Sequence, residues 1–509
     1  MNAFLLFRDR DFDVTAKLPP NHPDLVQDLE LSTLFHAMAG EDEFLLEVAK
    51  QAVLSGLRND SDTIRYRQDI LRDCLNHAAP VRDMYSIAVE AIDRERKDYF
   101  SALSSSPSTM MYRSTDVMQM FVGMLKKLKR IADEHAAHFA SEGFTRFFAM
   151  LQRELDEEYF ARVQQHLKEL KFNHGVFISA ALGKGNKGAD YILRKLPDKR
   201  SGWMERLFGA KPREYIFYIP DRDENGFRAL SELQNRGINL AANALAQSND
   251  HILSFFKLLR AELAFYIGCL NLQQRLAQKG EPLCFPLPVS ADERKHSFHG
   301  LYDVCLTLSM EPRVVGNAAN ADAKQLVVIT GANQGGKSTL LRGIGLAQLM
   351  MQCGMFVPAE SFCAEVCDGL FTHYKREEDA TMESGKFDEE LKRMSDIVDR
   401  LTPNSMLLCN ESFVATNERE GSEIARQIVS ALLEQGTRIF FVTHLYEFAR
   451  GIYDQQRRDA LFLRAERQPD GTRTFKLMEG EPLQTSYGKD LYGKIFGIAS
   501  ANAQERVDT

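Results

Sequence analysis

The stretch that most constrains this chain runs from Gly331 to Thr339 and reads Gly-Ala-Asn-Gln-Gly-Gly-Lys-Ser-Thr. It fits the pattern G-x-x-x-x-G-K-[ST], in which glycines let the backbone curl so that its N–H groups point at phosphate oxygens. In such loops the lysine, here Lys337, reaches the β- and γ-phosphates, and the next hydroxyl, on Ser338, ligates Mg²⁺. We therefore predict that the nine residues of the loop bind a nucleotide: Gly331, Ala332, Asn333, Gln334, Gly335, Gly336, Lys337, Ser338 and Thr339.

The residues on either side of this loop support the prediction. Residues 325–330 form a short apolar, β-branched run, which is typical of a buried parallel strand. Residues 340–353 are apolar good helix formers, and Gly354 is suited to end the helix. The N-terminus of that helix would add its partial positive charge to the phosphate site. The sequence thus predicts the order strand, phosphate-binding loop, helix.

Two further apolar runs end in polar groups that suit phosphate chemistry. Residues 405–410 end in Asn410-Glu411, and residues 438–443 lead to His444. An acidic strand end commonly delivers a carboxylate to Mg²⁺ and to the attacking water. Here Asn410 is an amide, which can orient a metal-bound water without adding charge, and Glu411 is the candidate general base. A histidine after a strand lies where α/β proteins bind ligands, so His444 is placed to donate to the γ-phosphate.

Composition leaves the functional class open. The 509 residues are 44% hydrophobic and 26% charged, as in a globular protein with two to four domains. The formal net charge of −8 gives no overall sign of nucleic-acid binding, although a local basic surface remains possible. The eight cysteines are scattered, so we expect reduced, mostly buried thiols and a cytoplasmic protein. No stretch is long and apolar enough to span a membrane.

The first 300 residues are mainly of helical pattern. Residues 24–171 and 227–278 show apolar residues at helical spacing, and an apolar stripe between Met118 and Leu128 predicts core packing. The exception is 172–222, where runs at 175–179 and 214–219 read as strands around a basic segment. That segment contains the candidate nucleic-acid contacts Lys199, Arg200, Lys211 and Arg213. Charge alone leaves two interpretations open: a phosphate-contacting insertion and a solvated loop.

With these motifs identified, residues 326–448 resemble the ATPase domain of the MutS family of DNA mismatch-repair proteins, a branch of the ABC-type ATPases. The motifs that carry the resemblance are residues 330–339, 354–359, Phe371-Thr372, Asn410-Glu411, 416–421, 442–444 and Ser486-Tyr487-Gly488. Residues 28–31 and 65–68 more weakly resemble the start of the family's helical core. The resemblance implies ATP as the nucleotide, dimerisation through the ATPase domains and DNA as a partner.

The sequence also departs from the family pattern. We find no N-terminal mismatch-reading domain and expect a short form of the family. Asn410 replaces the usual aspartate. The family's serine-threonine-phenylalanine signature is absent after Gly385, where Lys386-Phe387-Asp388 stands, and Ser384 is the nearest hydroxyl. Whether Ser384 contacts the ATP of a partner subunit stays open.

The sequence as a whole predicts a multidomain protein. Residues 1–300 would form an all-α core and lever region with a basic, clamp-like, β-containing insertion at about 172–222, and residues 301–509 an α/β P-loop (ABC-type) ATPase domain. Lys337, Glu411 and His444 would act in catalysis, and Ser338 and Asn410 would hold Mg²⁺. The expected function is a DNA-binding ATPase dimer in repair or recombination. Two alternatives are a nucleotide-gated scaffold with little hydrolysis and an ATPase that acts on structured RNA or ribosomes.

Overall fold

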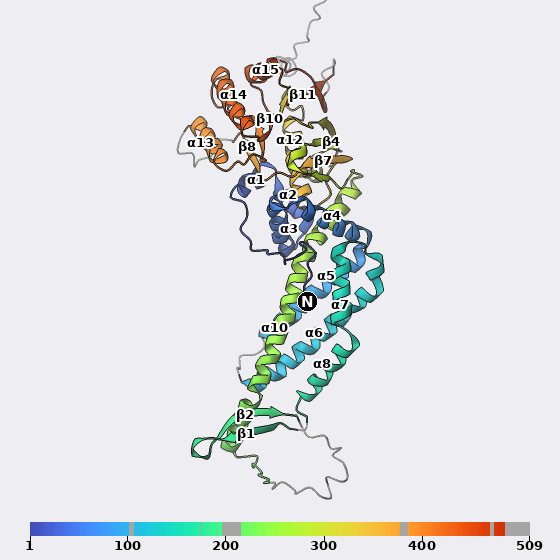
Figure 1. Cartoon of the computed structure of the whole chain (residues 1–509), viewed down its shortest axis with the longest axis vertical. Coiled ribbons are helices and arrows are strands. Elements are labelled where there is room, and N and C mark those ends of the chain that lie inside the picture. The colour runs from blue at the N-terminus through green and yellow to red at the C-terminus, as the bar shows by residue number, and fades with distance from the viewer. Residues whose placement is uncertain (101–105, 174, 196–214, 377–384, 469–472, 484–509) are drawn as a thin grey trace, which may run out of the picture. The chain divides into compact units, whose positions relative to one another are not determined.

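The structure is a computed structural model that describes residues 1–100, 106–173, 175–195, 215–376, 385–468 and 473–483 (Figure 1). The chain divides into two compact units. Unit 1 comprises residues 1–4 and 79–263, and unit 2 comprises residues 5–78 and 264–509. The long helix α10, Glu224–Gln278, contributes residues to both units.

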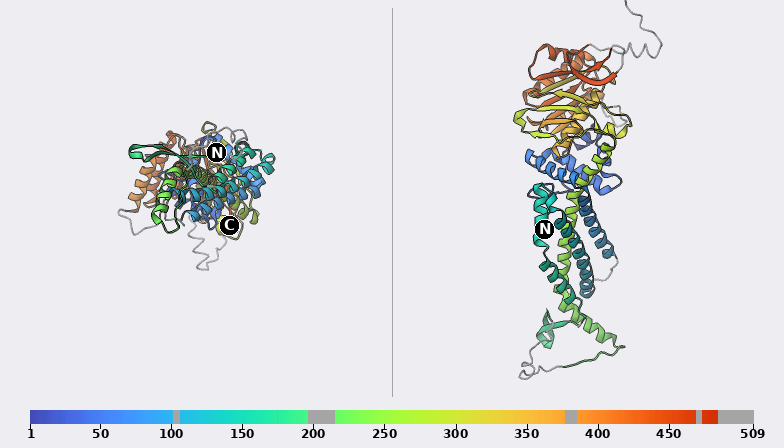
Figure 2. Two further views of the ribbon diagram at one scale, coloured as in Figure 1. Left: turned by 90° about the horizontal axis from the view of Figure 1, so that it is seen from below. Right: turned by 90° about the vertical axis from the view of Figure 1, so that its right-hand side faces the viewer.

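Unit 1 is built mainly from long helices that run along one another, with α8 continuing beyond α7 (Figure 2). The helices are α5 (Ala78–Phe100), α6 (Pro107–His135), α7 (Glu142–Glu154), α8 (Glu157–Glu169) and the first part of α10. Ser106, Ser141 and Asp156 cap α6, α7 and α8 by accepting backbone N–H hydrogen bonds. The stripe predicted on α6 is buried, and its Phe121 stacks on Phe256 of α10 at 5.8 Å. The helical prediction for this region is confirmed.

A two-stranded hairpin interrupts the helices of unit 1. Strands β1 (Phe177–Leu182) and β2 (Gly188–Arg194) pair antiparallel. Ile178 of the hairpin packs against α10 at Gly237. The contact needs glycine at this position, because a Cβ on Gly237 would lie 2.3 Å from Ile178 Cδ1. The strand expected at 175–179 is therefore present in part. The strand expected at 214–219 is wrong over its described part, since residues 215–219 pair with no other strand and their aromatic side chains are exposed.

Unit 2 begins with a group of helices from the N-terminal end of the chain. These are α1 (His22–Asp28), α2 (Leu31–Ala39), α3 (Glu43–Ser55) and α4 (Ser61–Asn76). Asp42 and Asp60 cap α3 and α4. Asn21, just before α1, donates a hydrogen bond to Leu370 O of the central sheet at 2.7 Å. The helical N-terminal segment is thus part of the same unit as the nucleotide loop.

The central element of unit 2 is a six-stranded sheet with the order β12-β11-β6-β10-β9-β8. Strands β11 (Ala460–Arg467), β6 (Leu326–Thr330), β10 (Arg438–Val442), β9 (Met406–Asn410) and β8 (Leu370–Tyr374) are parallel, and β12 (Arg473–Glu479) is antiparallel to β11. Uniformly apolar strands such as β6 and β10 are buried on both faces, as parallel strands generally are. The sequence predictions for the strands at 325–330, 405–410 and 438–443 are confirmed.

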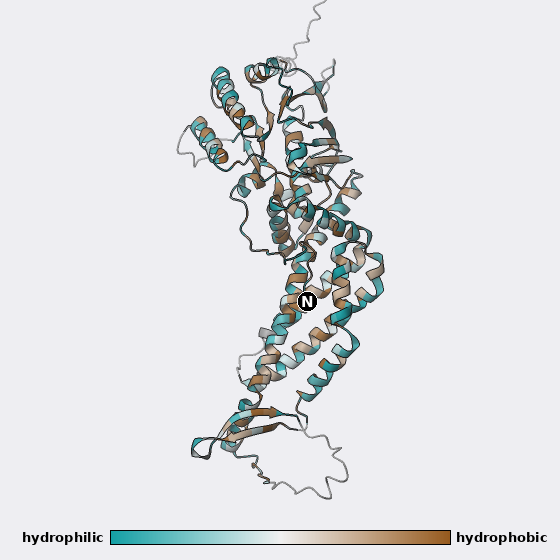
Figure 3. Ribbon diagram, in the orientation of Figure 1, coloured by the Kyte–Doolittle hydropathy of each residue, from teal (hydrophilic) through white to brown (hydrophobic). Residues whose placement is uncertain are grey.

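Helices cover both faces of this sheet. One face packs on α13 (Lys386–Val398), α14 (Glu418–Glu434) and α15 (Tyr446–Asp454), which carry hydrophobic and hydrophilic residues together (Figure 3). The other face packs on α12 (Lys337–Gln352), the helix after the phosphate loop. This approach is close, since a Cβ on Gly345 of α12 would lie 2.6 Å from Leu408 Cδ1 of β9. This close packing fixes the position of the N-terminus of α12 relative to the end of β9.

A second, four-stranded sheet in unit 2 has the order β3-β7-β4-β5. Its strands are β3 (Leu287–Val289), β7 (Ser361–Glu365), β4 (His296–Leu301) and β5 (Asn317–Asn320), and the short helix α11 (Val304–Ser309) follows β4. His296 is fully buried and its ring lies 4.9 Å from that of Phe440 in β10, whereas His299 is exposed and bound to Glu360. No strand forms at 356–359, where Val357 only bridges to Cys284.

The two units differ from the predicted division at residue 300. Residues 5–78 and 264–300 group with the residues of the central sheet. As a division into functional domains, the boundary at 300 stays a prediction. All eight cysteines are free, and six of them are buried. Within the described residues, no helix combines the length and the apolar character that crossing a bilayer requires.

Candidate nucleotide-binding site

The phosphate loop adopts a backbone that depends on glycine. Gly331 has φ 118° and Gly336 has φ 89°, both in the left-handed region that other residues rarely adopt. A Cβ on Gly331 would also lie 2.9 Å from the backbone N of Ala465 in β11. The loop therefore turns tightly between β6 and α12, and it delivers Lys337 to the first turn of the helix.

Lys337 is turned inward. Its Nζ donates to Gly331 O at 2.8 Å and to Ala332 O at 2.9 Å, and the residue is only 4% exposed. Burial lowers the pKa of Lys337 to about 8, while the nearby Glu411 carboxylate acts to raise it. An ammonium group bound to carbonyl oxygens of the loop is in the position from which it can be transferred to phosphate oxygens.

Ser338 and Asn410 meet between the loop and the neighbouring strands. The hydroxyl of Ser338 donates to Asn410 Oδ1 at 2.9 Å. This contact places the first turn of α12 against the carboxyl end of β9. Hydroxyl and amide oxygens are hard donors of the kind that Mg²⁺ accepts, so the pair fits a magnesium ion that takes its remaining ligands from phosphate and water. The pair itself is neutral.

Glu411 and His444 also come together. Their atoms Oε1 and Nε2 lie 2.9 Å apart, with the histidine as donor. The hydrogen bond from His444 is the largest cause that lowers the pKa of Glu411; burial opposes it, and the charges of His444, Lys337 and Lys375 reinforce it. Glu411 has φ 54°, and its backbone N donates to Val442 O at 2.9 Å. The carboxylate is therefore ionised and held in a defined position at the strand ends.

The turn behind Glu411 is supported by α13. The Glu390 carboxylate of this helix accepts from Phe413 N at 2.5 Å, and burial raises the pKa of Glu390. Next to it, His373 Nδ1 lies 2.7 Å from the hydroxyl of Ser412. These side chains link the segment after β9 to α13 and to β8. A movement of α13 would therefore displace the backbone next to Glu411.

Sequence reasoning missed two residues near this edge. Lys375 directly follows β8, and its backbone N donates to Asn410 O at 2.9 Å. Arg473, at the start of β12, donates to Gln334 of the phosphate loop. Lys375 carries a detectable signal, since it follows an apolar run as Glu411 and His444 do. Arg473 carries none, because only the pairing of β12 with β11 brings it to the loop.

Other predicted residues are not brought to this site. Lys199, Arg200, Lys211 and Arg213 lie outside the described residues, as do Ser384 and Ser486-Tyr487-Gly488. On the hairpin of unit 1 the described basic residues, such as Lys184, Lys187 and Arg194, are exposed. The basic character of the hairpin thus extends onto its described surface.

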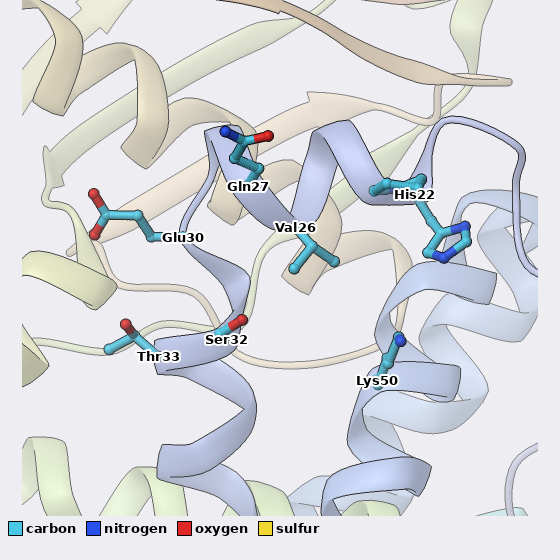
Figure 4. A pocket seen from close by; sticks show the side chains of 8 residues that line it. His22, Val26, Gln27, Glu30, Ser32, Thr33 and Lys50 are labelled. Carbon is cyan, nitrogen blue, oxygen red and sulfur yellow. The ribbon is translucent and has the colours of Figure 1, made fainter. Parts of the chain in front are cut away.

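A separate groove in unit 2 has a volume of about 620 Å³ and is formed by α1, α2 and α3 (Figure 4). It shares no residue with the phosphate loop. Its Glu30 side chain is bound to Arg342 of α12, which also donates to Asp303 at 2.5 Å. The lining residues are His22, Pro23, Val26, Gln27, Glu30, Ser32, Thr33 and Lys50. The Glu30–Arg342 ion pair links the N-terminal helices to α12, and the Asp303–Arg342 pair links α12 to the start of α11.

Comparison with known proteins gives matches at both ends of the chain. Residues 59–279 match the family model of the MutS2 N-terminal domain, and residues 327–498 match that of MutS domain V. Together the two models cover more than half of the chain.

Relatives were found in bacteria and in mouse. The DNA mismatch repair protein MutS of Thermotoga maritima is 34% identical over 176 residues, which are 34% of this chain and 22% of that protein. The mouse MutS protein homolog 4 is 30% identical over 167 residues, 33% of this chain and 17% of the relative. The MutS of Clostridium kluyveri is 27% identical over 220 residues, 42% of this chain and 25% of the relative. These alignments thus span at most a quarter of each relative.

Proposed function

This chain belongs to the MutS family, and from that premise we propose that it is a DNA-binding ATPase of DNA repair or recombination. ATP binding would close two copies over the nucleotide through their ATPase regions, which would have the P-loop, ABC-type arrangement. Hydrolysis would then reset the helical arms. The two family models that match are those of the MutS2 N-terminal domain and of MutS domain V, and the proposal rests on these alone and does not include mismatch recognition.

One observation carries the ATPase proposal: the ends of three strands converge on a single edge of the central sheet. The phosphate loop follows β6, Asn410 and Glu411 end β9, and His444 follows β10. In open α/β sheets, ligands bind outside the carboxyl ends of the strands. The contacts Ser338–Asn410 and Glu411–His444 lie at this edge.

Each residue has a role that follows from its chemistry. The loop N–H groups and Lys337 would bind the phosphates, and Ser338 and Asn410 would hold Mg²⁺, which neutralises phosphate charge when bound. Glu411 would take a proton from the attacking water. His444 was predicted to donate to the γ-phosphate. Its Nε2 is occupied by Glu411, so we now propose that it first positions this carboxylate.

The direct test is nucleotide binding by the variant Lys337→Ala. We expect ATP binding and turnover to be lost, because the loop then lacks the cation that its carbonyls now hold. Lys392→Ala is the matched control: this lysine is exposed on α13 in the same unit. Normal ATP affinity in a folded Lys337→Ala protein would contradict the proposed site.

A second candidate function is a nucleotide-gated scaffold that hydrolyses ATP slowly or not at all. The neutral Ser338–Asn410 pair favours it, because the metal site then lacks a carboxylate charge. Single-turnover hydrolysis with excess protein separates the two functions. If bound ATP is hydrolysed in the single turnover, the result supports the ATPase. If ATP stays bound and is not hydrolysed, the result supports the scaffold.

The nucleic-acid partner requires a comparison of substrates. Binding to duplex DNA, branched DNA and structured RNA at two salt concentrations would rank them, since phosphate contacts alone carry no sequence information. Preference for either DNA supports the repair or recombination assignment. Preference for structured RNA would move the ATPase to RNA or ribosomes.

A further inference from the structure

Lys375 lies beside the proposed catalytic residues although no motif includes it. Strand β8 pairs with β9 so that Tyr374 is opposite Asn410, and the backbone N of Lys375 donates to Asn410 O at 2.9 Å. Asn410 in turn accepts from Ser338 of the nucleotide helix. The backbone of Lys375 is thus fixed one residue away from Glu411, at the same edge of the sheet.

The side chain of Lys375 is free to act on a ligand. It is exposed, and among the described residues no hydrogen bond or ion pair holds its ammonium group. Its charge nevertheless reaches the site, because it contributes to the lowered pKa of Glu411 and opposes the rise that burial causes in the pKa of Glu390. A lysine is a flexible point charge on a four-carbon stem, suited to follow a mobile phosphate group.

The strand order indicates which phosphate Lys375 would meet. The phosphate loop follows β6, and β10, β9 and β8 succeed it along the sheet. Lys337 lies in the helix that begins after β6, at one end of this series of strands, and Lys375 follows β8 at the other end. Glu411 follows β9, between them. Since the general base must act on the water that attacks the terminal phosphate, the residue beyond Glu411 faces the γ-phosphate more closely than the α-phosphate.

The charge of the site gives such a residue a purpose. Asn410 is neutral and stands where the MutS family pattern has an aspartate. The site therefore attracts a divalent cation less strongly than a site with a carboxylate at this position would. Within the described edge, the ammonium groups of Lys337 and Lys375 both act on Glu411. A second lysine would offset part of the phosphate charge that a weakly held cation leaves.

Resting on the ATPase function proposed above, we propose that Lys375 is a second phosphate-binding lysine that contacts the terminal phosphate of ATP. It makes the protein prefer triphosphate over diphosphate, and it preserves this preference when divalent cation is scarce. Lys337 then serves both nucleotides, and Lys375 serves ATP alone.

The test is a set of equilibrium affinities measured by calorimetry for ADP and for a non-hydrolysable ATP analogue. Each is measured with millimolar Mg²⁺ and with EDTA, on the full chain and on Lys375→Ala, Lys375→Arg and the control Lys392→Ala. We expect Lys375→Ala to weaken the ATP analogue by about 10- to 100-fold and to leave ADP unchanged, as for loss of one charge-assisted hydrogen bond. The loss should be greater in EDTA, and arginine should restore much of the affinity.

Several outcomes overturn the proposal. Equal losses for both nucleotides would mean that Lys375 acts on the whole site, and unchanged affinities would leave it a solvated lysine. A loss that arginine does not reduce would also oppose a phosphate contact. If the unaltered chain binds neither nucleotide, the proposed function fails as well. If it binds both and Lys337→Ala binds neither, only the role of Lys375 is in question.

Discussion

The edge of the central sheet in unit 2 and the hairpin region of unit 1 place similar side chains in opposite surroundings. In unit 2, Lys337 is 4% exposed and Phe441 is fully buried. In unit 1, Phe217 is 88% and Ile216 91% exposed, and the basic residues of the hairpin are in solvent. At the sheet edge, the side chains of Lys337, Ser338, Asn410, Glu411 and His444 bond within the protein, whereas the hairpin region presents charged and apolar side chains to solvent.

The difference separates two kinds of functional residue. At the sheet edge, contacts such as Glu411–His444 give a group one defined partner, on which its proposed role depends. On the hairpin, a basic residue contributes its charge to a shared surface. Single substitutions should therefore have large effects in unit 2, and grouped substitutions should be needed in unit 1.

The largest expected effect is on the rate of hydrolysis. Glu411→Gln keeps the size of the side chain and its contact with His444 but removes the base, so turnover should fall about 10²- to 10⁴-fold. ATP binding should persist and should favour a closed dimer. Turnover is measured by phosphate release and dimerisation by sedimentation; unchanged turnover would show that another group activates the water.

Two phenylalanines test the contrast in burial directly. Phe441→Ala should lower the free energy of unfolding by about 3–5 kcal/mol, because it opens a cavity among buried residues of β10. Phe217→Ala should change it by less than about 0.5 kcal/mol. Urea unfolding of both variants gives the comparison. A large loss from Phe217→Ala would mean that the exposed segment contributes to the fold.

Grouped substitution of the basic segment tests unit 1. Replacing Lys199, Arg200, Lys211 and Arg213 by alanine should weaken nucleic-acid binding and flatten its log–log salt dependence by up to about 3.6, from about 0.9 per duplex phosphate contact. Basal ATPase activity should persist. If the salt slope does not change, the segment is a solvated loop, and the basic face of α6 at 126–130 becomes the next surface to test.

A smaller effect is expected from restoring charge at the metal site. Asn410→Asp places a carboxylate beside Ser338, so the Mg²⁺ concentration for half-maximal ATP binding should fall, by about tenfold for one charged contact. A titration of Mg²⁺ at fixed ATP measures the shift. No shift, in a variant that still binds ATP, would mean that residue 410 does not hold the ion.

The smallest effect is a pH dependence of ATP affinity. Burial lowers the pKa of Lys337 to about 8 without nucleotide, and phosphate would raise it, so binding above pH 8 takes up a proton. Affinity should not depend on this group below pH 8, and it should fall above pH 8 by up to about tenfold per pH unit. Calorimetry in two buffers of different ionisation enthalpy measures the proton uptake. A flat profile above pH 8 would show that Lys337 stays charged.

What the sequence could predict follows from the range of the interactions involved. Strands β6, β9 and β10 are continuous apolar runs, and the phosphate loop is a local motif, so both were found from neighbouring residues. The strand expected at 214–219 was wrong because an aromatic run has β propensity but also needs a partner strand. Lys375 follows an apolar run, which is a local signal, but its place beside Asn410 depends on the β8–β9 register, in which Tyr374 is opposite a residue 36 positions later in the chain. The burial of His296 likewise depends on Phe440, from another sheet.

Unit 2 is composed of two pieces of chain that are made at different times. Residues 5–78 leave the ribosome first, yet Arg67 donates hydrogen bonds to Leu6 O and to Cys353 O, at the end of α12. A Cβ on Gly345 of α12 would also lie 2.9 Å from Leu29 Cδ2.

At about 5–20 residues per second, the residues between these two pieces of chain take roughly tens of seconds to be translated. During that interval unit 1 can fold while the apolar faces of the first four helices stay uncovered. The proposed nucleotide site therefore cannot be complete until α12 has been made, and a chain interrupted before α12 would give chaperones and proteases an unfinished surface to recognise.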